Sequence, residues 1–179
     1  WFHGENLWWL FRTRDFIPEY DKIYCVSEPV RKQVIARFPE LADRTEVLLN
    51  FIDIKQVQRR SEEPLSDPQY TGELKFLTVG RASEEKGYDI AVQITAELKK
   101  RGLRFKWFII GDGRDLNKLR TMAKEYQVEQ EIIFLGMREN PAPYVKSCDL
   151  YLQPSRHEGY PITIVEARSL QKVIIASDI

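Results

Sequence analysis

The stretch Leu150–Ala167, with the sequence LYLQPSRHEGYPITIVEA, decides how the chain is expected to fold. It begins with an apolar segment of strand character, continues through a short polar loop and ends in a helical pattern. Pro161 stands near the first helical position, where the missing N–H of proline is no loss. We therefore predict a strand, a tight loop and a helix, in that order.

Two glutamates in this stretch, Glu158 and Glu166, are candidate ligand-binding residues. Glu158 is expected in the loop beside the N-terminal end of the helix, where exposed amides can bind phosphate. Glu166 is expected about two helical turns further on, and a buried carboxylate that accepts two hydrogen bonds suits a vicinal diol such as a ribose. Two glutamates at this spacing also arise by chance, so a buried helix flanked by solvated carboxylates is the alternative.

The region from residue 74 onward alternates short apolar segments with longer amphipathic ones. Such alternation implies right-handed crossovers and a parallel sheet. The predicted fold class is therefore α/β, a Rossmann-like parallel sheet with helices on both faces, which binds ligands at the carboxyl ends of its strands. The predicted strands are 74–79, 105–110, 132–135, 149–153 and 173–176, and the predicted helices are 84–100, 114–126, 144–147 and 162–170.

The polar segment 61–73 contains two prolines, which is typical of a linker or surface loop. Before it, 22–26 and 46–49 are expected as strands, with a helix at 29–37 capped by Ser27. We divide the chain into 1–60, the linker or loop 61–73, and 74–179. Because the chain starts within an aromatic segment and stops just after a strand-like one, we expect a piece of a longer enzyme.

Positive charge is expected at the carboxyl edge of the sheet. Gly80 lets the backbone turn closely after the strand at 74–79, and Arg81 and Lys86 flank the loop that follows. Two fixed cations at such an edge can stabilise a negatively charged ligand. No two aspartates are two residues apart, so the metal-holding Asp-x-Asp pattern is missing. For this pair taken alone, a solvated arginine and lysine at a helix start is the alternative.

The segment Gly111-Asp112-Gly113 invites comparison with a dinucleotide-binding fingerprint. The third glycine position holds Leu116, and a fingerprint should open from the first strand with an acidic residue about 20 positions on. We therefore do not predict NAD binding. The glycines are expected to serve a tight turn, with Asp112 or Asp115 as a helix cap.

Composition narrows the class of protein. Lysine plus arginine and aspartate plus glutamate each number 27, so the net charge is zero, whereas a nucleic-acid-binding protein usually carries a basic excess. The apolar runs are too short to cross a bilayer. Cys25 and Cys148 stand alone, as reduced core cysteines do, which favours a cytoplasmic protein. The aromatic cluster at 8–16 is interpreted as core or interdomain packing, with a membrane-facing patch as the alternative.

Together these segments resemble the GT-B glycosyltransferases, in particular the retaining group 1 (family four) class. The resemblance is strong over 74–179 and weak over 1–53. It implies the C-terminal donor-binding domain of a GT-B enzyme, preceded by a fragment of the N-terminal domain. The matching segments are the two glutamates of Leu150–Ala167, Gly80-Arg81 with Lys86-Gly87, Gly111-Asp112-Gly113, and Phe134-Leu135-Gly136-Met137.

The resemblance implies roles for individual residues. Glu158 would contact the sugar hydroxyls, and Glu166 would hold the ribose. Arg81 and Lys86 would stabilise the leaving diphosphate. His3 is either a residue near the sugar and acceptor or a structural one. The remaining implied binding residues are Gly80, then Gly136 and Met137 bordering the base, and Gly159, Tyr160 and Ile162 after the first glutamate.

The implied reaction moves a sugar from a UDP- or GDP-linked donor to a hydroxyl of a glycan, polysaccharide or lipid-linked acceptor. It retains the anomeric configuration and needs neither metal nor cofactor. We expect residues 1–179 to be inactive alone, and a peripheral contact with the inner face of a membrane stays open. Two alternatives remain: a non-catalytic nucleotide-binding module, and a sugar-nucleotide epimerase of the same fold.

Overall fold

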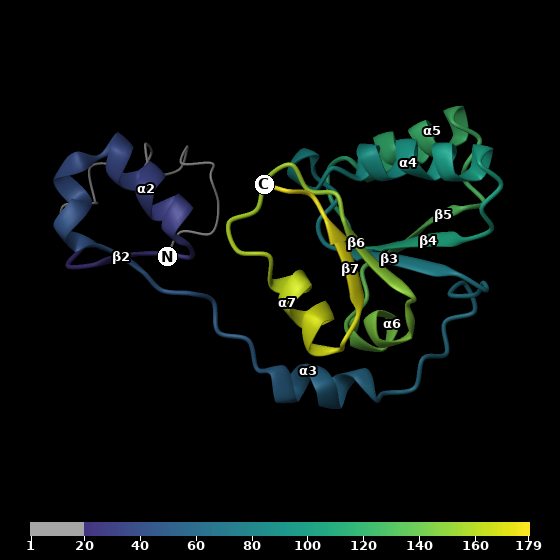
Figure 1. The fold of residues 1–179 in the computed structure, drawn as a ribbon, viewed down its shortest axis with the longest axis horizontal. Helices are drawn as coiled ribbons and strands as arrows, with labels where there is room; N and C mark the ends of the chain where they lie inside the picture. The colour runs from purple at the N-terminus through teal and green to yellow at the C-terminus, as the bar shows by residue number, and fades with distance from the viewer. Residues whose placement is uncertain (1–19) are drawn as a thin grey trace. The chain divides into compact units, whose positions relative to one another are not determined.

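The computed structural model describes residues 20–179, whose packing divides them into two compact units (Figure 1). The smaller unit contains 20–51 and 157–162, and the larger contains 52–156 and 163–179. Each unit has its own apolar core. Within the described part of the chain, no helix combines the length and apolar character that a membrane crossing requires. His3 and the aromatic cluster at 8–16 lie outside the described residues.

The smaller unit is built on two short parallel strands, β1 (Ile23–Cys25) and β2 (Thr45–Val47). Between them run the helix α2 (Glu28–Arg37) and the 3₁₀ helix η2 (Pro39–Arg44). Ser27 caps α2, because its Oγ accepts from the Val30 N–H at 3.5 Å. The predicted strand–helix–strand order and the predicted cap are thus confirmed. The buried core consists of Ile23, Cys25, Val26, Val30, Val34, Phe38 and Leu41.

The larger unit is built on five parallel strands in the order β5-β4-β3-β6-β7. The predicted α/β class and parallel sheet are therefore confirmed. The strands are β3 (Lys75–Val79), β4 (Lys106–Ile110), β5 (Ile132–Gly136), β6 (Leu150–Gln153) and β7 (Val173–Ala176). The helices that connect them are α4 (Tyr88–Lys100), α5 (Leu116–Glu125), α6 (Ala142–Ser147) and α7 (Ile162–Ser169).

Helices cover both faces of this sheet, with α4 and α5 on one side and α6 and α7 on the other (Figure 1). Successive strand residues point to opposite faces, and both sets are apolar here because both faces are buried. Phe76, Trp107 and Ile109 pack with α4 and α5. Leu77 and Phe108, their neighbours in sequence, pack with α6 and α7. This alternation explains the near-continuous apolar character of the strands.

A helix that the sequence analysis did not predict, α3 (Ile54–Ser61), opens the larger unit. Asp53 caps it by accepting from the Gln56 N–H at 2.9 Å. The loop at 62–74 is fastened to the sheet unit, since Tyr70 is buried with its ring 4.4 Å from that of Phe108. The unit thus begins at Ile52, upstream of the division that we expected at residue 60.

The helix predicted at 84–100 is interrupted. Glu84–Lys86 forms a short 3₁₀ helix, η3, and Gly87 follows in the left-handed region with φ 65° before α4 begins. A Cβ at Gly87 would stand 2.0 Å from the carbonyl oxygen of Pro154. Glycine is therefore required where the loop after β3 passes the loop after β6.

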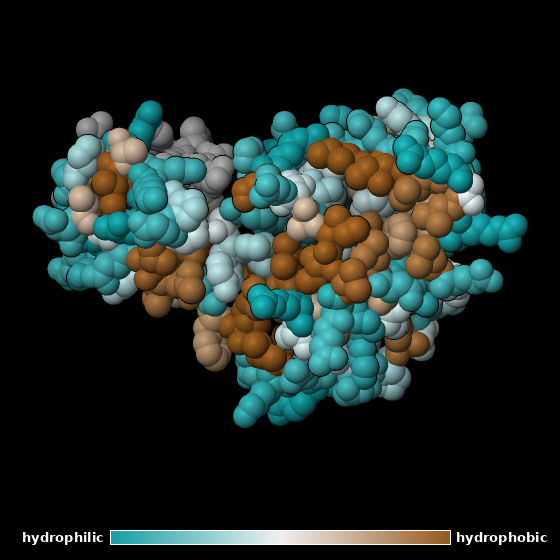
Figure 2. All heavy atoms as spheres, viewed as in Figure 1, coloured by the Kyte–Doolittle hydropathy of each residue, from teal (hydrophilic) through white to brown (hydrophobic). Residues whose placement is uncertain are grey.

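β7 borders the sheet, and among the described residues it pairs with β6 alone. Val173 and Ile175 on this strand are 65% and 59% exposed. Figure 2 shows apolar surface over this part of the unit. Cys25 and Cys148 are buried and free, as expected for core cysteines.

Candidate active site

The topology of the larger sheet selects one place for a ligand. The chain leaves β3 for β4 on one side, while β6, which comes later in sequence, pairs with β3 on the other. A parallel sheet whose strand order reverses in this way binds ligands outside the carboxyl ends of the two central strands. The loops after β3 and β6, which contain most of the residues singled out in the sequence, begin at this position.

Backbone hydrogen bonds join the loops after β3, β4 and β5. Gly80 N–H donates to the Ile110 carbonyl, and Gly111 N–H to that of Gly136, each at 2.9 Å. Gly111 has φ 136°, and a Cβ there would stand 1.9 Å from the Gly80 oxygen. The expected tight turn is therefore present, and it needs glycine because the backbone of Gly111 contacts that of Gly80.

Of the two aspartates expected to cap the helix after Gly113, Asp115 takes the N-cap position of α5, but its side chain makes no capping hydrogen bond. Asp112 Oδ1 instead accepts from the adjacent Gly113 N–H at 2.7 Å, ahead of the helix. The turn is held by backbone contacts, including the Asp115 N–H to the Ala82 carbonyl at 3.1 Å, so no side chain is needed to start the helix.

The structure brings Gly80, Arg81 and Lys86 together directly after β3. The Cδ and Cε atoms of Lys86 lie 3.8 Å from the position that a Cβ on Gly80 would occupy. Lys86 is half-buried, and Arg81 is exposed. A hydrogen bond from Ser83 lowers the pKa of Glu85, with smaller contributions from Arg114 and Arg81. The loop therefore places two cations, Arg81 and Lys86, after the strand at the switch point of the sheet, beside the carboxylates of Glu84 and Glu85.

Gly136 and Met137 lie at the carboxyl end of β5, with Gly136 at φ 75° and the Met137 side chain 75% exposed. Arg138 stabilises this turn, because its Nη1 donates to the carbonyls of Leu135 and Met137. The guanidinium is held in turn by Asp67. Neither Arg138 nor Asp67 was singled out from the sequence, and no local motif marks them.

Glu166 lies on α7 at the edge of a cavity of about 100 Å³. Burial raises the pKa of its carboxyl group, and the positive charge of Arg60 on α3 opposes that effect. A buried carboxylate can accept hydrogen bonds from both hydroxyls of a diol with little competition from water. The cavity is lined by Gln56, Val57, Arg60, Asn140, Pro141, Ala142, Val145, Glu166 and Leu170.

The segment 157–162 groups with the smaller unit, where Tyr160 packs against the core around Ile23. Glu158, Gly159, Tyr160 and Ile162 therefore belong to one unit. Gly80, Arg81, Lys86, Gly136, Met137 and Glu166 belong to the other. The second set thus shares one unit, whereas the grouping of both sets around one ligand stays a prediction. Among residues 20–179, no three His, Cys, Asp or Glu side chains lie close enough together to hold a metal ion.

The parallel sheet with helices on both faces has the Rossmann-like architecture of a GT-B domain. The chain belongs to the family described as Glycosyl transferases group 1, which matches residues 60–179. An uncharacterized glycosyltransferase of Methanocaldococcus jannaschii is 30% identical over 89% of this chain and 40% of its own length. The chain thus spans less than half the length of this relative.

Two further similarities accord with this membership. A Campylobacter jejuni enzyme named as a diphospho-undecaprenol 4-alpha-N-acetylgalactosaminyltransferase is 25% identical over 90% of this chain and 42% of its own length. The crystal structure of a mutant of S. aureus TarM, solved with UDP among its ligands, superposes with a TM-score of 0.76 over 94% of this chain and 33% of TarM. At 17% identity, TarM shows likeness of fold.

Proposed function

We propose that this chain supplies the donor-binding part of a retaining glycosyltransferase that moves a sugar from a nucleotide diphosphate donor to a hydroxyl acceptor. One observation carries the proposal: in a member of this family, Arg81 and Lys86 lie at the switch point of the sheet, and Glu166 lies on a helix of the same unit. The same arrangement supports separate roles for these residues, with Arg81 and Lys86 binding the diphosphate and Glu166 the ribose.

Arg81 and Lys86 are proposed to stabilise the leaving diphosphate. Charge grows on the diphosphate as the bond to the sugar breaks, and fixed cations that are already in place stabilise that charge without reorganisation. This electrostatic contribution is the one that a metal ion makes in other enzymes. We therefore propose that the reaction needs neither metal nor cofactor.

Glu166 is proposed to bind the ribose, and Glu158 the hydroxyls of the transferred sugar. The backbone amides at Gly159, Tyr160 and Ile162 would face the donor at the start of α7. A helix N-terminus stabilises an anion by up to about 2 kcal/mol in a partly buried site. Gly136 and Met137 would border the base through main-chain groups.

The acceptor is proposed to be a glycan or a lipid-linked hydroxyl. The name of the Campylobacter jejuni relative, which specifies an undecaprenol-linked acceptor, supports the lipid-linked form. A cytoplasmic protein in peripheral contact with the inner face of a membrane would meet such an acceptor. The net charge of the chain is zero, so a nucleic-acid partner is not proposed.

Calorimetry on the 179-residue chain tests the donor site. UDP or GDP is expected to bind more tightly than NAD, and EDTA is expected to leave the affinity unchanged. Tighter binding of NAD than of either diphosphate would overturn the assignment. In the full-length protein, NMR of the product distinguishes retention from inversion, and release of free nucleoside diphosphate without acceptor would indicate an epimerase.

A further inference from the structure

The loop after β6 is anchored to the start of α4 by one arginine. Arg156 Nη1 donates to Asp89 Oδ1, and Nη2 to Asp89 Oδ2, each at 2.7 Å. The backbone N–H of Arg156 donates to the Glu85 carbonyl at 2.7 Å, and Nη1 also donates to that of Glu84 at 3.2 Å. One residue therefore makes four hydrogen bonds to the segment that follows β3.

Two other features show that this approach is close and fixed. Gly87, between Glu85 and Asp89, has no side chain because the Pro154 carbonyl occupies that space. The Asp89 and Arg156 side chains are 33% and 36% exposed, so water screens them in part. Hydrogen bonds from Arg156 still lower the pKa of Asp89, against the opposing effect of burial.

The pairing also determines what Arg156 does not do. Its guanidinium faces a carboxylate at both Nη atoms, so its charge is neutralised locally. A diphosphate would have to compete with Asp89 for the same donors. Arg156 is therefore poorly suited to be a third diphosphate cation beside Arg81 and Lys86. The two-pronged contact that an arginine makes with a carboxylate is instead suited to fixing the orientation of the loop that carries the arginine.

We propose that Arg156, held by Asp89, is a positioning residue that fixes where the chain leaves β6 toward Glu158, against the segment that follows Lys86. The inference rests on the proposed function. Arg156 stands two residues before Glu158, and Lys86 stands three before Asp89. The ion pair therefore joins two segments that each lie within three residues of a group proposed to act on the sugar or the diphosphate. Its role is geometric, and an exposed pair of this kind adds little to stability.

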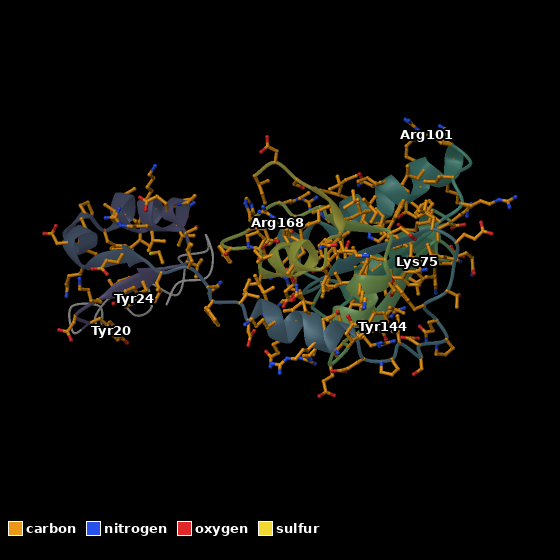
Figure 3. All side chains as sticks on the ribbon, turned by 60° about the horizontal axis from the view of Figure 1, so that its bottom comes forward. Tyr20, Tyr24, Lys75, Arg101, Tyr144 and Arg168 are labelled. Carbon is orange, nitrogen blue, oxygen red and sulfur yellow. The ribbon has the colours of Figure 1, made fainter. Side chains whose placement is uncertain are left out.

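The test compares Arg156→Gln, Arg156→Lys and Asp89→Asn, with Arg101→Gln as the matched control. Arg101 pairs with Glu97 at the opposite end of α4 and projects into solvent (Figure 3). Steady-state kinetics are measured on the full-length protein, uridine and UDP affinities on the 179-residue chain, and thermal midpoints on all variants.

Arg156→Gln and Asp89→Asn are expected to lower kcat by about 10- to 100-fold, because small misplacements of reacting groups have effects of this size. Uridine affinity and the thermal midpoint should match those of the Arg101→Gln control. Arg156→Lys should lower kcat as well, since a lysine cannot donate to both oxygens of Asp89 in the two-pronged arrangement. Asp89→Asn is decisive, because it leaves the charge of Arg156 in place while replacing one of the two accepting carboxylate oxygens with an amide NH2 group that cannot accept.

Three outcomes would overturn the inference. If Asp89→Asn keeps kcat while Arg156→Gln loses UDP affinity, Arg156 is a direct diphosphate ligand. If Arg156→Lys restores full activity, charge rather than geometry matters. If all variants behave like Arg101→Gln, the ion pair has no role in the reaction. A wild-type protein that binds no UDP and transfers no sugar would instead refute the proposed function itself.

Discussion

Arg138 donates from Nε and Nη2 to the same oxygen of Asp67, Oδ2, at 3.1 and 2.7 Å, although the two residues are 71 positions apart in sequence. Tyr144 on α6, labelled in Figure 3, donates to that oxygen as well, at 2.9 Å. The loop at 62–74 is thereby tied to the turn that is proposed to border the nucleotide base.

This network makes stability depend on pH. Burial alone would raise the pKa of Asp67, but hydrogen bonds from Arg138, the Gln69 N–H and Tyr144 lower it. A lowered folded-state pKa contributes stability that is present above the unfolded value of about 3.9 and is lost as pH falls through the folded value. Asp67→Asn should lower the free energy of unfolding at pH 7 by about 1.5–3 kcal/mol.

The measurement is urea unfolding of both proteins at several pH values. The difference between wild type and Asp67→Asn should shrink as the pH is lowered below 4. Glu97→Gln, which removes an exposed ion pair on α4, should change the midpoint little. A difference that does not depend on pH would mean that the Asp67 charge contributes nothing to stability.

Substitutions in the donor site should separate ribose binding from diphosphate binding. Glu166→Ala should weaken both uridine and UDP about 10- to 100-fold, because a hydrogen bond to a charged group contributes about 1.5–3 kcal/mol. Lys86→Ala and Arg81→Ala should weaken UDP to a similar degree and leave uridine nearly unchanged. Calorimetry with both ligands checks this, with the exposed Lys124→Ala as control. Equal losses of uridine affinity in all three variants would contradict the assigned roles.

Glu166 should reduce stability in the absence of ligand. Burial raises the pKa of its carboxyl group, so the folded state favours the protonated form. The associated stability is fully present below the unfolded pKa of about 4.3 and is lost as pH rises through the folded pKa. Glu166→Gln should therefore raise the thermal midpoint at pH 7 but not at pH 4. An unchanged midpoint at pH 7 would show that the carboxylate is not desolvated.

Gly87 should tolerate no side chain. Gly87→Ala places a Cβ 2.0 Å from a backbone oxygen in a left-handed conformation, and should lower the free energy of unfolding by about 2–5 kcal/mol. Gly102 is the matched control, since it has φ 79° with nothing within 4 Å of its Cβ position. Gly102→Ala should cost only the conformational part, about 1–2 kcal/mol. Equal losses, measured by chemical unfolding, would refute the close approach of the two loops.

The 179-residue chain is expected to bind donor but to transfer no sugar. Chemistry in a GT-B enzyme takes place in a cleft between two domains, and the chain spans about 40% of the Methanocaldococcus jannaschii relative. Incubation with nucleotide sugars and candidate acceptors, followed by mass spectrometry, checks this. Acceptor-dependent transfer by this chain would mean that the catalytic cleft has been misplaced.

The strands of the large sheet could be predicted from sequence because burial on both faces makes each one a short apolar run. The same signal was absent for α3, whose sequence IKQVQRRS is mostly polar. Only the cap at Asp53 and the apolar pair Ile54 and Val57 mark that helix. The break at Gly87 was missed because the helical pattern continues through it, while the reason for the break lies in Pro154, far along the chain.

The candidate site residues also divide into those that the local sequence predicts and those that depend on distant parts of the chain. Local motifs marked Gly80, Arg81, Lys86 and Glu166, since the chemistry of each is visible within a few neighbours. The partners that hold the site in shape are not local. Asp89 and Arg156 are 67 positions apart, and no property of either residue alone indicates the other.

The loop at 62–74 also determines where the donor domain can be separated from the rest of the chain. A truncation at the first sheet residue, Lys75, would remove Asp67 and Tyr70 and leave Arg138 without its carboxylate. It would also uncover Phe108. A fragment intended to keep these contacts should therefore start upstream, near Ile52. A protease that nicks this loop should release a destabilised sheet rather than a clean domain.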